Sequence, residues 1–442
     1  MTMKVLRFIA IIMIFGGVSA AWLALGTTMW ARTEDLDHTL SQEMRSLWGP
    51  ETLMQTSPYV ADKGDAKRTD AGAAAPSSST ITVDITHDSR YKGLLWFSTF
   101  SVVFDGTYSF DAVSAFSAGS GAFICELPRG VTGYDGLSVE LNGVAQSIPI
   151  SQISSGRITL SVDRSVAATV RVHYVTKGQD VWLYSPSGAS MGGGSRGEGL
   201  WGPDDGDMVP SGKSLVSLAD FSLTVNTNFA NIDYPRGTLS PNTPASSNNG
   251  GVTAVWSFDN ALTKQGMGIV MPRRPNAGPI AMRMSLFAPV SLFFFFAILF
   301  TVVVLKKIPL HPMHYLFVAA AFFAFHVLLA YLVDKISIHT GFWICAAVSV
   351  LLVVSYMRLV AGAGFAVIYV GAAQLVYLVG FSYAFFYPGW TGLSVIVAAV
   401  ITLFVLMQCT GRLDWFKVFG RGNGPTSPPA PPRVAPDGTG AA

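Results

Sequence analysis

The stretch LFAPVSLFFFFAILFTVVVL, residues 286–305, decides the class of this protein, because it has no charged side chain over 20 residues. A helix needs about 20 apolar residues to cross the hydrocarbon core of a bilayer. Similar runs elsewhere give six predicted spanning helices, at 8–30, 286–305, 314–333, 341–357, 360–383 and 391–409. One helix at the N-terminus and five near the C-terminus predict an integral membrane protein.

The composition agrees with this class. Charged residues make up 13% of the chain and the mean hydropathy is +0.43, whereas soluble proteins are about 25% charged. The net charge of +2 gives no case for binding nucleic acid. Between Ser285 and Thr410 the charged residues all fall between apolar runs, where a membrane protein places them; they are Lys306, Lys307, Asp334, Lys335 and Arg358.

The N-terminus has two possible interpretations. Lys4 and Arg7 precede an apolar run, and Val18-Ser19-Ala20 resembles the site at which a signal peptide is cleaved. The run nevertheless continues to Trp30, which is longer than the 7–15 apolar residues of a typical signal peptide. The sequence therefore favours an uncleaved signal-anchor helix over residues 1–30.

The basic residues predict the orientation of the chain. Six spans place both termini on one side of the membrane. Lys4, Arg7 and the Lys306-Lys307 pair fit cytoplasmic loops, in agreement with the positive-inside rule. We therefore expect a multi-pass membrane protein with cytoplasmic termini and a large extracytoplasmic region between the first two helices.

The first part of this region, residues 31–79, is predicted to contain a helix and a linker. Leu36, Leu40, Met44 and Leu47 recur with helical spacing and indicate an amphipathic extension of the anchor. Trp48-Gly49-Pro50 ends that helix. Residues 63–80 are rich in Ala, Ser, Asp and Lys, as flexible linkers are.

Residues 80–284 are predicted to form an all-β, sandwich-like domain. Apolar residues alternate with polar ones from Ile81, and turn residues separate short runs of the same kind at 93–104, 121–127, 157–162, 168–174, 215–225 and 252–258. A Gly-rich stretch at 186–213 leaves open a division into two lobes. Cys125 is the single cysteine of this region, so no disulfide can form inside it. The five-helix bundle follows at 285–410, and the Pro/Gly-rich tail at 411–442 is predicted to be disordered.

Two motifs in the polar region resemble functional sites, a serine-hydrolase nucleophile and a calcium-binding loop, but each lacks features that such a site requires. Ser190 and Ser195 each match the G-x-S-x-G pattern of serine hydrolases, but the expected following helix is replaced by Gly-rich sequence. No histidine follows them within the polar domain. Asp204-Asp205-Gly206-Asp207 could offer oxygen ligands to calcium, but it lacks the spacing and closing Glu of an EF-hand loop. A solvated turn is the simpler interpretation.

The histidines of the membrane region are the other candidates. His326 lies in the middle of the third span, where an ionisable side chain suggests function by default, although a neutral, hydrogen-bonded histidine is the simpler alternative. His311 and His314 provide only two ligands for a metal site. We therefore assign no catalytic, cofactor-binding or metal-binding residue and predict a protein that is not an enzyme.

The third span carries sequence motifs that resemble the bacterial CreD family. These are His311-Pro312-Met313-His314-Tyr315-Leu316 before the span and His339-Thr340-Gly341-Phe342 after it, with Gly411-Arg412-Leu413-Asp414-Trp415-Phe416 near the end. Trp48-Gly49-Pro50 and Asn231-Ile232-Asp233-Tyr234-Pro235 lie where the family has similar segments. His314 replaces the usual Gln, and Ile338 replaces an acid, so the chain resembles a divergent member.

The resemblance implies an inner-membrane protein with a role in cell-envelope integrity and the response to β-lactam stress, whose biochemical activity is not established. The implied partners are membrane lipid and envelope proteins or periplasmic components that contact the β domain. The alternative is a small-molecule transporter or channel component, which His326 favours. The absence of acids from the spans and of obvious broken helices argues against it.

Overall fold

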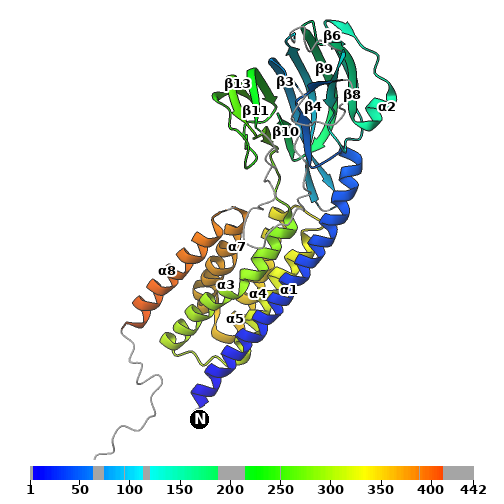
Figure 1. Cartoon of the computed structure of the whole chain (residues 1–442). Coiled ribbons are helices and arrows are strands. Elements are labelled where there is room, and N and C mark those ends of the chain that lie inside the picture. The colour runs from blue at the N-terminus through cyan, green and yellow to red at the C-terminus, as the bar shows by residue number, and fades with distance from the viewer. Residues whose placement is uncertain are drawn as a thin grey trace, which may run out of the picture. The chain divides into compact units, whose positions relative to one another are not determined.

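The structure is a computed structural model that describes residues 3–62, 74–93, 95–112, 120–187, 215–248, 250–387 and 389–411. It divides into two compact units. The first, Met1–Thr27 with Ala281–Ala442, is helical, and the second, Thr28–Ile280, is mainly β structure (Figure 1). Ser190, Ser195, the Asp204–Asp207 segment and the tail after Gly411 lie outside the described residues.

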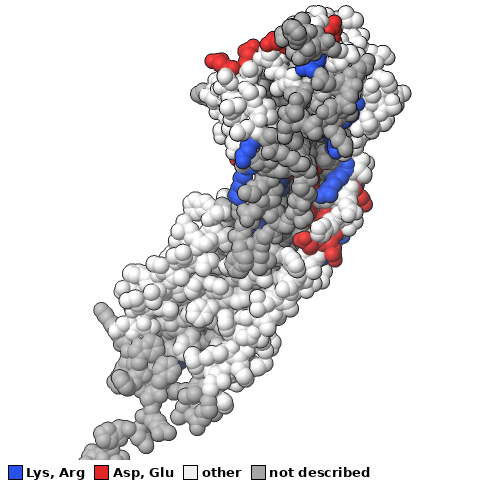
Figure 2. Space-filling view, in the orientation of Figure 1, with Lys and Arg blue, Asp and Glu red and all other residues white. Residues whose placement is uncertain are grey.

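Six helices are long and apolar enough to cross a membrane, which confirms the prediction of one N-terminal and five C-terminal spans. The helical unit is almost free of Lys, Arg, Asp and Glu on the face seen in Figure 2. The helices are α1 (Met3–Trp48), α3 (Ala277–Lys306), α4 (Pro312–Leu332), α5 (Ile338–Ala361), the Phe365–Phe386 helix and α8 (Thr391–Thr410).

The Phe365–Phe386 helix differs from the others in its hydrogen bonding. It contains two π-helical segments, η3 (Phe365–Gly371) and η4 (Leu375–Gly380), separated by a short α-helical segment, α6 (Ala372–Gln374). It ends with α7 (Phe381–Tyr383) and η5 (Ala384–Phe386). The wide π turns place Gln374 between two segments of altered helical geometry.

The second unit contains three sheets. The strands of the largest are β12 (Thr243–Asn248), β13 (Gly251–Thr263), β11 (Val216–Thr227), β3 (Ser78–Lys92), β4 (Leu95–Phe110), β9 (Ala168–Gln179), β6 (Asp135–Leu141) and β7 (Val144–Ala145), in this order across the sheet. The two smaller sheets are β1 (Thr52–Thr56), β10 (Val181–Ser185) and β14 (Met267–Val270), and β2 (Tyr59–Asp62), β5 (Ser120–Glu126) and β8 (Arg157–Asp163). A short helix, α2 (Ile150–Ser155), precedes β8.

The three sheets share one hydrophobic core. The β3 residues Ile81, Val83 and Ile85 are buried and alternate with exposed neighbours, which is the pattern of a strand with one face in the core. Ring contacts connect the large sheet to both small ones, Phe110 to Phe123 at 5.9 Å and Tyr184 to Phe221 at 5.7 Å between centroids. This packing agrees with the predicted sandwich-like β domain.

Two details of the sequence-based organisation need correction. The 31–79 region, expected to hold only a helix and a linker, also contributes β1 and β2, because β1 pairs in parallel with β10 and β2 pairs with β5. The two lobes left open at 186–213 are not separate sheets. Strand β11, which follows that segment, pairs in parallel with β3, which precedes it.

The C-terminal end of α1 is fixed within the β-rich unit. The Trp48 ring contacts both Arg90 and Lys177, whose charged groups are 4.3 and 4.8 Å from its centroid. The helix ends there because Gly49 has a φ of 99°, and a Cβ at Gly49 would lie 2.7 Å from the main-chain oxygen of Lys177. The main-chain oxygen of Gly49 also accepts a hydrogen bond of 2.8 Å from Gln179 Nε2. The end of α1 is therefore held by packing, charge and hydrogen bonds together.

Candidate functional site: a polar cluster among the spanning helices

Five of the polar side chains buried inside the helical unit are connected through the Phe365–Phe386 helix, and we call them the polar cluster. They come from four helices, α3, α5, the Phe365–Phe386 helix and α8. Each is at most 5% exposed. Buried polar groups need hydrogen-bond partners, most of all where no water competes. The members are Ser291, Ser349, Gln374, Tyr377 and Thr402.

Gln374 connects its helix to α5 and α4. Its Nε2 donates to Ser349 Oγ at 3.0 Å, and Ser349 Oγ in turn donates to the Ala321 carbonyl at 2.8 Å. The Gln374 Oε1 atom is buried and has no hydrogen-bond partner in the described part of the chain. An amide can make about four hydrogen bonds, so this side chain keeps unused capacity.

Tyr377 connects the same helix to α3 and α8. Its carbonyl accepts a hydrogen bond from the Ser291 hydroxyl. Its own hydroxyl lies 2.8 Å from Thr402 Oγ1. Since Thr402 Oγ1 already donates to the Ala398 carbonyl at 2.6 Å, Tyr377 is the donor in this pair. Through Gln374 and Tyr377 the Phe365–Phe386 helix is therefore linked to α3, α4, α5 and α8.

The geometry of the helix adds to the case for this site. π turns are rare and recur at functional positions. Here one π-helical segment ends just before α6, which carries Gln374, and the next contains Tyr377. A buried amide with an unpaired oxygen in such a helix can bind a hydrogen-bond donor, or it can set how the helices pack.

His326 is not part of the polar cluster. It lies in α4, is 1% exposed, and its Nδ1 bonds to the Phe322 carbonyl at 3.1 Å. Its ring contacts Trp22 of α1 edge-on, with 5.5 Å between centroids. No described residue forms a hydrogen bond with its Nε2 atom. His326 therefore lies where α4 contacts α1.

The other histidines of the membrane region each make a different contact. His311 Nδ1 accepts from the Met313 amide at 3.3 Å and caps α4. His314 Nδ1 bonds to Tyr356 Oη at 2.7 Å, and His339 stacks on Phe386 with centroids 4.5 Å apart. In the part of the chain that the structure describes, no group of three His, Cys, Asp or Glu side chains could hold a metal ion. The geometry thus adds no third ligand to His311 and His314.

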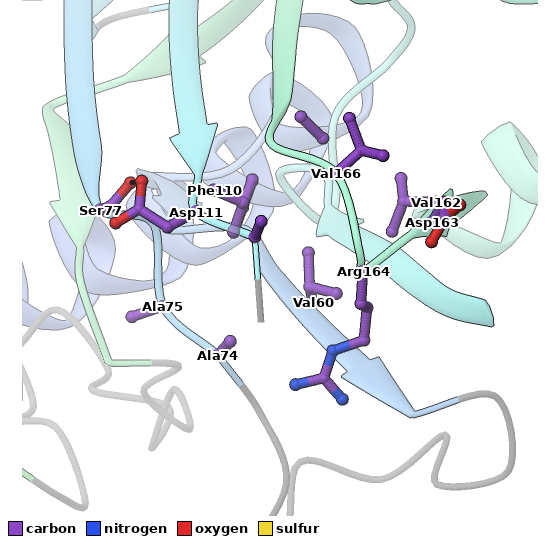
Figure 3. Close-up of a pocket in the computed structure, with 12 residues that line it drawn as sticks. Val60, Ala74, Ala75, Ser77, Phe110, Asp111, Val162, Asp163, Arg164 and Val166 are labelled. Carbon is purple, nitrogen blue, oxygen red and sulfur yellow. Dashed lines mark hydrogen bonds between the residues drawn. The ribbon is translucent and has the colours of Figure 1, made fainter. Parts of the chain in front are cut away.

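The β-rich unit contains a cavity of about 230 Å³. Figure 3 shows Ser77 and Asp111 on one side and Val162 and Arg164 on the other. Ser77 Oγ donates to Asp111 Oδ1 at 2.9 Å. Asp163, also in the lining, accepts from the Ser165 hydroxyl and amide, and these bonds lower the pKa of its carboxyl. The cavity is smaller than the 300–1,000 Å³ of most small-molecule sites, so the polar cluster is the stronger candidate.

Comparison with known proteins agrees with the architecture. Residues 251–416 match the family described as inner membrane protein CreD. The match confirms the resemblance drawn from the motifs at the third span, and it includes the whole polar cluster. Residues 251–416 are thus similar to an inner membrane protein family, and the six candidate spans imply helices that contact lipid. No curated protein sequence matches the chain.

The polar cluster was not predicted from the sequence, although the sequence contains one signal for it. Gln374 is the only Asn, Gln or charged residue between Phe365 and Phe386. A side-chain amide in a spanning helix usually bonds to a neighbouring helix. The serines and threonines gave no such signal, because they can bond to their own helix, as Thr402 does with Ala398.

Proposed function

We propose that this CreD-like protein maintains the integrity of the cell envelope and is not an enzyme, with its β domain outside the inner membrane and both termini in the cytoplasm. The observation that carries the proposal is the family match over residues 251–416, together with six spans that flank a β-rich region. The basic residues at the predicted inner ends of the spans, Lys306 among them, support the orientation.

We propose further that the β domain acts through contacts with envelope proteins or periplasmic components. Each sheet ends in two outer strands, among them β7, β8 and β12, and outer strands offer main-chain groups for pairing. The domain's cysteine supports a role without covalent chemistry. Burial raises the pKa of the Cys125 thiol to about 12, and the thiolate is the nucleophilic form.

Deletion of the gene tests this function. We expect the deletion strain to become more sensitive to β-lactams and to detergent, and we expect the full chain to restore resistance. Crosslinking in the native membrane, followed by mass identification, should recover envelope components bound to the β domain. Unchanged sensitivity, with no β-domain crosslink, would contradict the proposed role.

Fusions test the orientation separately. Alkaline phosphatase is active only outside the cytoplasm. A fusion at Gly212 should be active, and a fusion after Phe419 should be inactive. The reverse activities would contradict the orientation whatever the outcome of the deletion.

A second function, the transport of a small molecule or ion, is favoured by one specific observation. Gln374 and His326 are buried in spanning helices, and each has a polar atom without a hydrogen-bond partner. Liposomes that contain the purified full chain and a trapped pH indicator test the simplest case, proton movement. Flux above that of empty liposomes, reduced by Gln374→Leu or His326→Phe, would move the transport function ahead of envelope maintenance.

A further inference from the structure

The contact between α1 and α4 contains two buried nitrogen atoms that lack partners. Trp22 is fully buried and His326 is 1% exposed. Their rings meet edge-on, with centroids 5.5 Å apart and planes at 86°. Among the residues that the structure describes, Trp22 Nε1 and His326 Nε2 each have no hydrogen-bond partner. Both residues lie in helices that can span the membrane, where bulk water cannot satisfy them.

The chemistry of the two nitrogens is complementary. A carbonyl oxygen only accepts hydrogen bonds, so the Nδ1 atom of His326 carries the proton that it donates to the Phe322 carbonyl at 3.1 Å. In the neutral ring Nε2 is then an acceptor. The indole Nε1–H of Trp22 is a donor and nothing else. One ring thus offers a donor and the other an acceptor.

We propose that Trp22 and His326 bind one water molecule between α1 and α4. Water both accepts and donates, so a single molecule can accept from Trp22 Nε1–H and donate to His326 Nε2. Buried water molecules typically bond to polar groups that are otherwise unsatisfied. An unpaired polar group in the bilayer core is unfavourable, and satisfying both nitrogen atoms is the driving force for binding.

The bridge gives α1 a polar attachment to the helical unit. Between Leu6 and Trp30, Trp22 and Gly26 are the buried residues of α1. Gly26 packs closely, because a Cβ at that position would lie 2.5 Å from the side chain of Leu286. Trp22 also contacts Phe323 at 5.7 Å between centroids. The water site therefore lies in the small area where the membrane-spanning part of α1 is buried, and we expect it to fix the rotation of that part of the helix.

Infrared spectroscopy of the purified full chain tests the site. An internal water gives an O–H stretching band that shifts when the solvent is exchanged for H₂¹⁸O. We expect one such band in the wild type and its loss in both Trp22→Phe and His326→Asn. Asn can reproduce the Nδ1 donor of His326 but has no atom in place of Nε2, so this variant keeps the bond to Phe322. Trp30→Phe, on an exposed part of α1, is the matched control and should keep the band.

The indole N–H band supplies a second readout. The difference between wild type and Trp22→Phe isolates the Trp22 N–H, which we expect to be hydrogen-bonded in the wild type and free in His326→Asn. A hydrogen-bonded N–H without an ¹⁸O-sensitive water band would indicate a direct Trp22–His326 bond and overturn the proposal. A free N–H in the wild type would overturn it as well. Folding is checked by gel filtration, and if His326→Asn fails to fold, Trp22→Phe alone decides the outcome.

Discussion

Replacing Ser349 and replacing Gln374 both remove the hydrogen bond between them, but the two substitutions should lower the free energy of unfolding by different amounts. Ser349→Ala leaves the Gln374 amide with no partner for Nε2, in addition to the Oε1 atom that already lacks one. An orphaned buried amide costs about 1–3 kcal/mol. Gln374→Leu removes the same bond, worth about 0.6 kcal/mol in membrane proteins, but it also removes the unsatisfied oxygen. We therefore expect Gln374→Leu to change the free energy of unfolding by less than about 1 kcal/mol.

Equilibrium unfolding of the full chain by SDS in mixed micelles measures both variants. The variant that carries both Ser349→Ala and Gln374→Leu should be more stable than Ser349→Ala alone, because the leucine replaces the amide that would be left without a partner. Ser355→Ala on the exposed face of α5 and Gln408→Leu on α8 are matched controls and should stay within about 0.5 kcal/mol of the wild type. A Gln374→Leu variant that loses as much stability as Ser349→Ala would refute the reasoning. One that is stable but fails to restore envelope resistance would indicate a functional amide.

Three further outcomes follow from the chain. Burial lowers the pKa of His87, so the stability that its neutral form contributes is complete above about pH 6.5 and is lost as the pH falls through the lowered pKa. Thermal unfolding measured at several pH values should show this loss. His87→Gln should make the unfolding temperature depend less on pH. Ser190→Ala and Ser195→Ala together should leave β-lactam resistance unchanged, and labelling of either serine by a fluorophosphonate would contradict this. N-terminal sequencing of the mature protein should find α1 present, so a start at Ala21 would refute the signal anchor.

The spans could be predicted because the bilayer imposes a strong and local requirement. About 20 apolar residues in sequence mark each helix, and the structure has all six. The period-two strands β3, β9 and β13 could be predicted for the same reason, since alternation is visible within a few residues. β10 (Val181–Ser185) could not, because all five of its residues are buried and no alternation remains. The parallel pairings of β1 with β10 and of β11 with β3 join residues far apart in sequence, which local patterns do not encode.

The candidate site was less predictable than the fold. His326 stood out in the sequence because an ionisable residue in a span is rare, and the structure buries it against Trp22. The significance of Gln374 depends on Ser349, 25 residues away, and on the carbonyl of Ala321 in a third helix. The π-helical segments on either side of Gln374 consist mainly of apolar residues, which give no local signal for altered helical geometry. Partners across helices are thus what sequence alone could not supply.

The extent of the family match decides which variants test the proposed function most directly. Residues 251–416 include β13, β14 and the five C-terminal spans, but not α1 or the strands from β1 to β12. What the family implies for this chain therefore rests mainly on the helical unit, which contains the polar cluster. Gln374 and Tyr377 lie inside the matched region, whereas Trp22 and Trp48 lie outside it, where substitutions test how this chain attaches α1. If only the second pair changes envelope resistance, the function depends on the attachment of α1, and the polar cluster has a structural role.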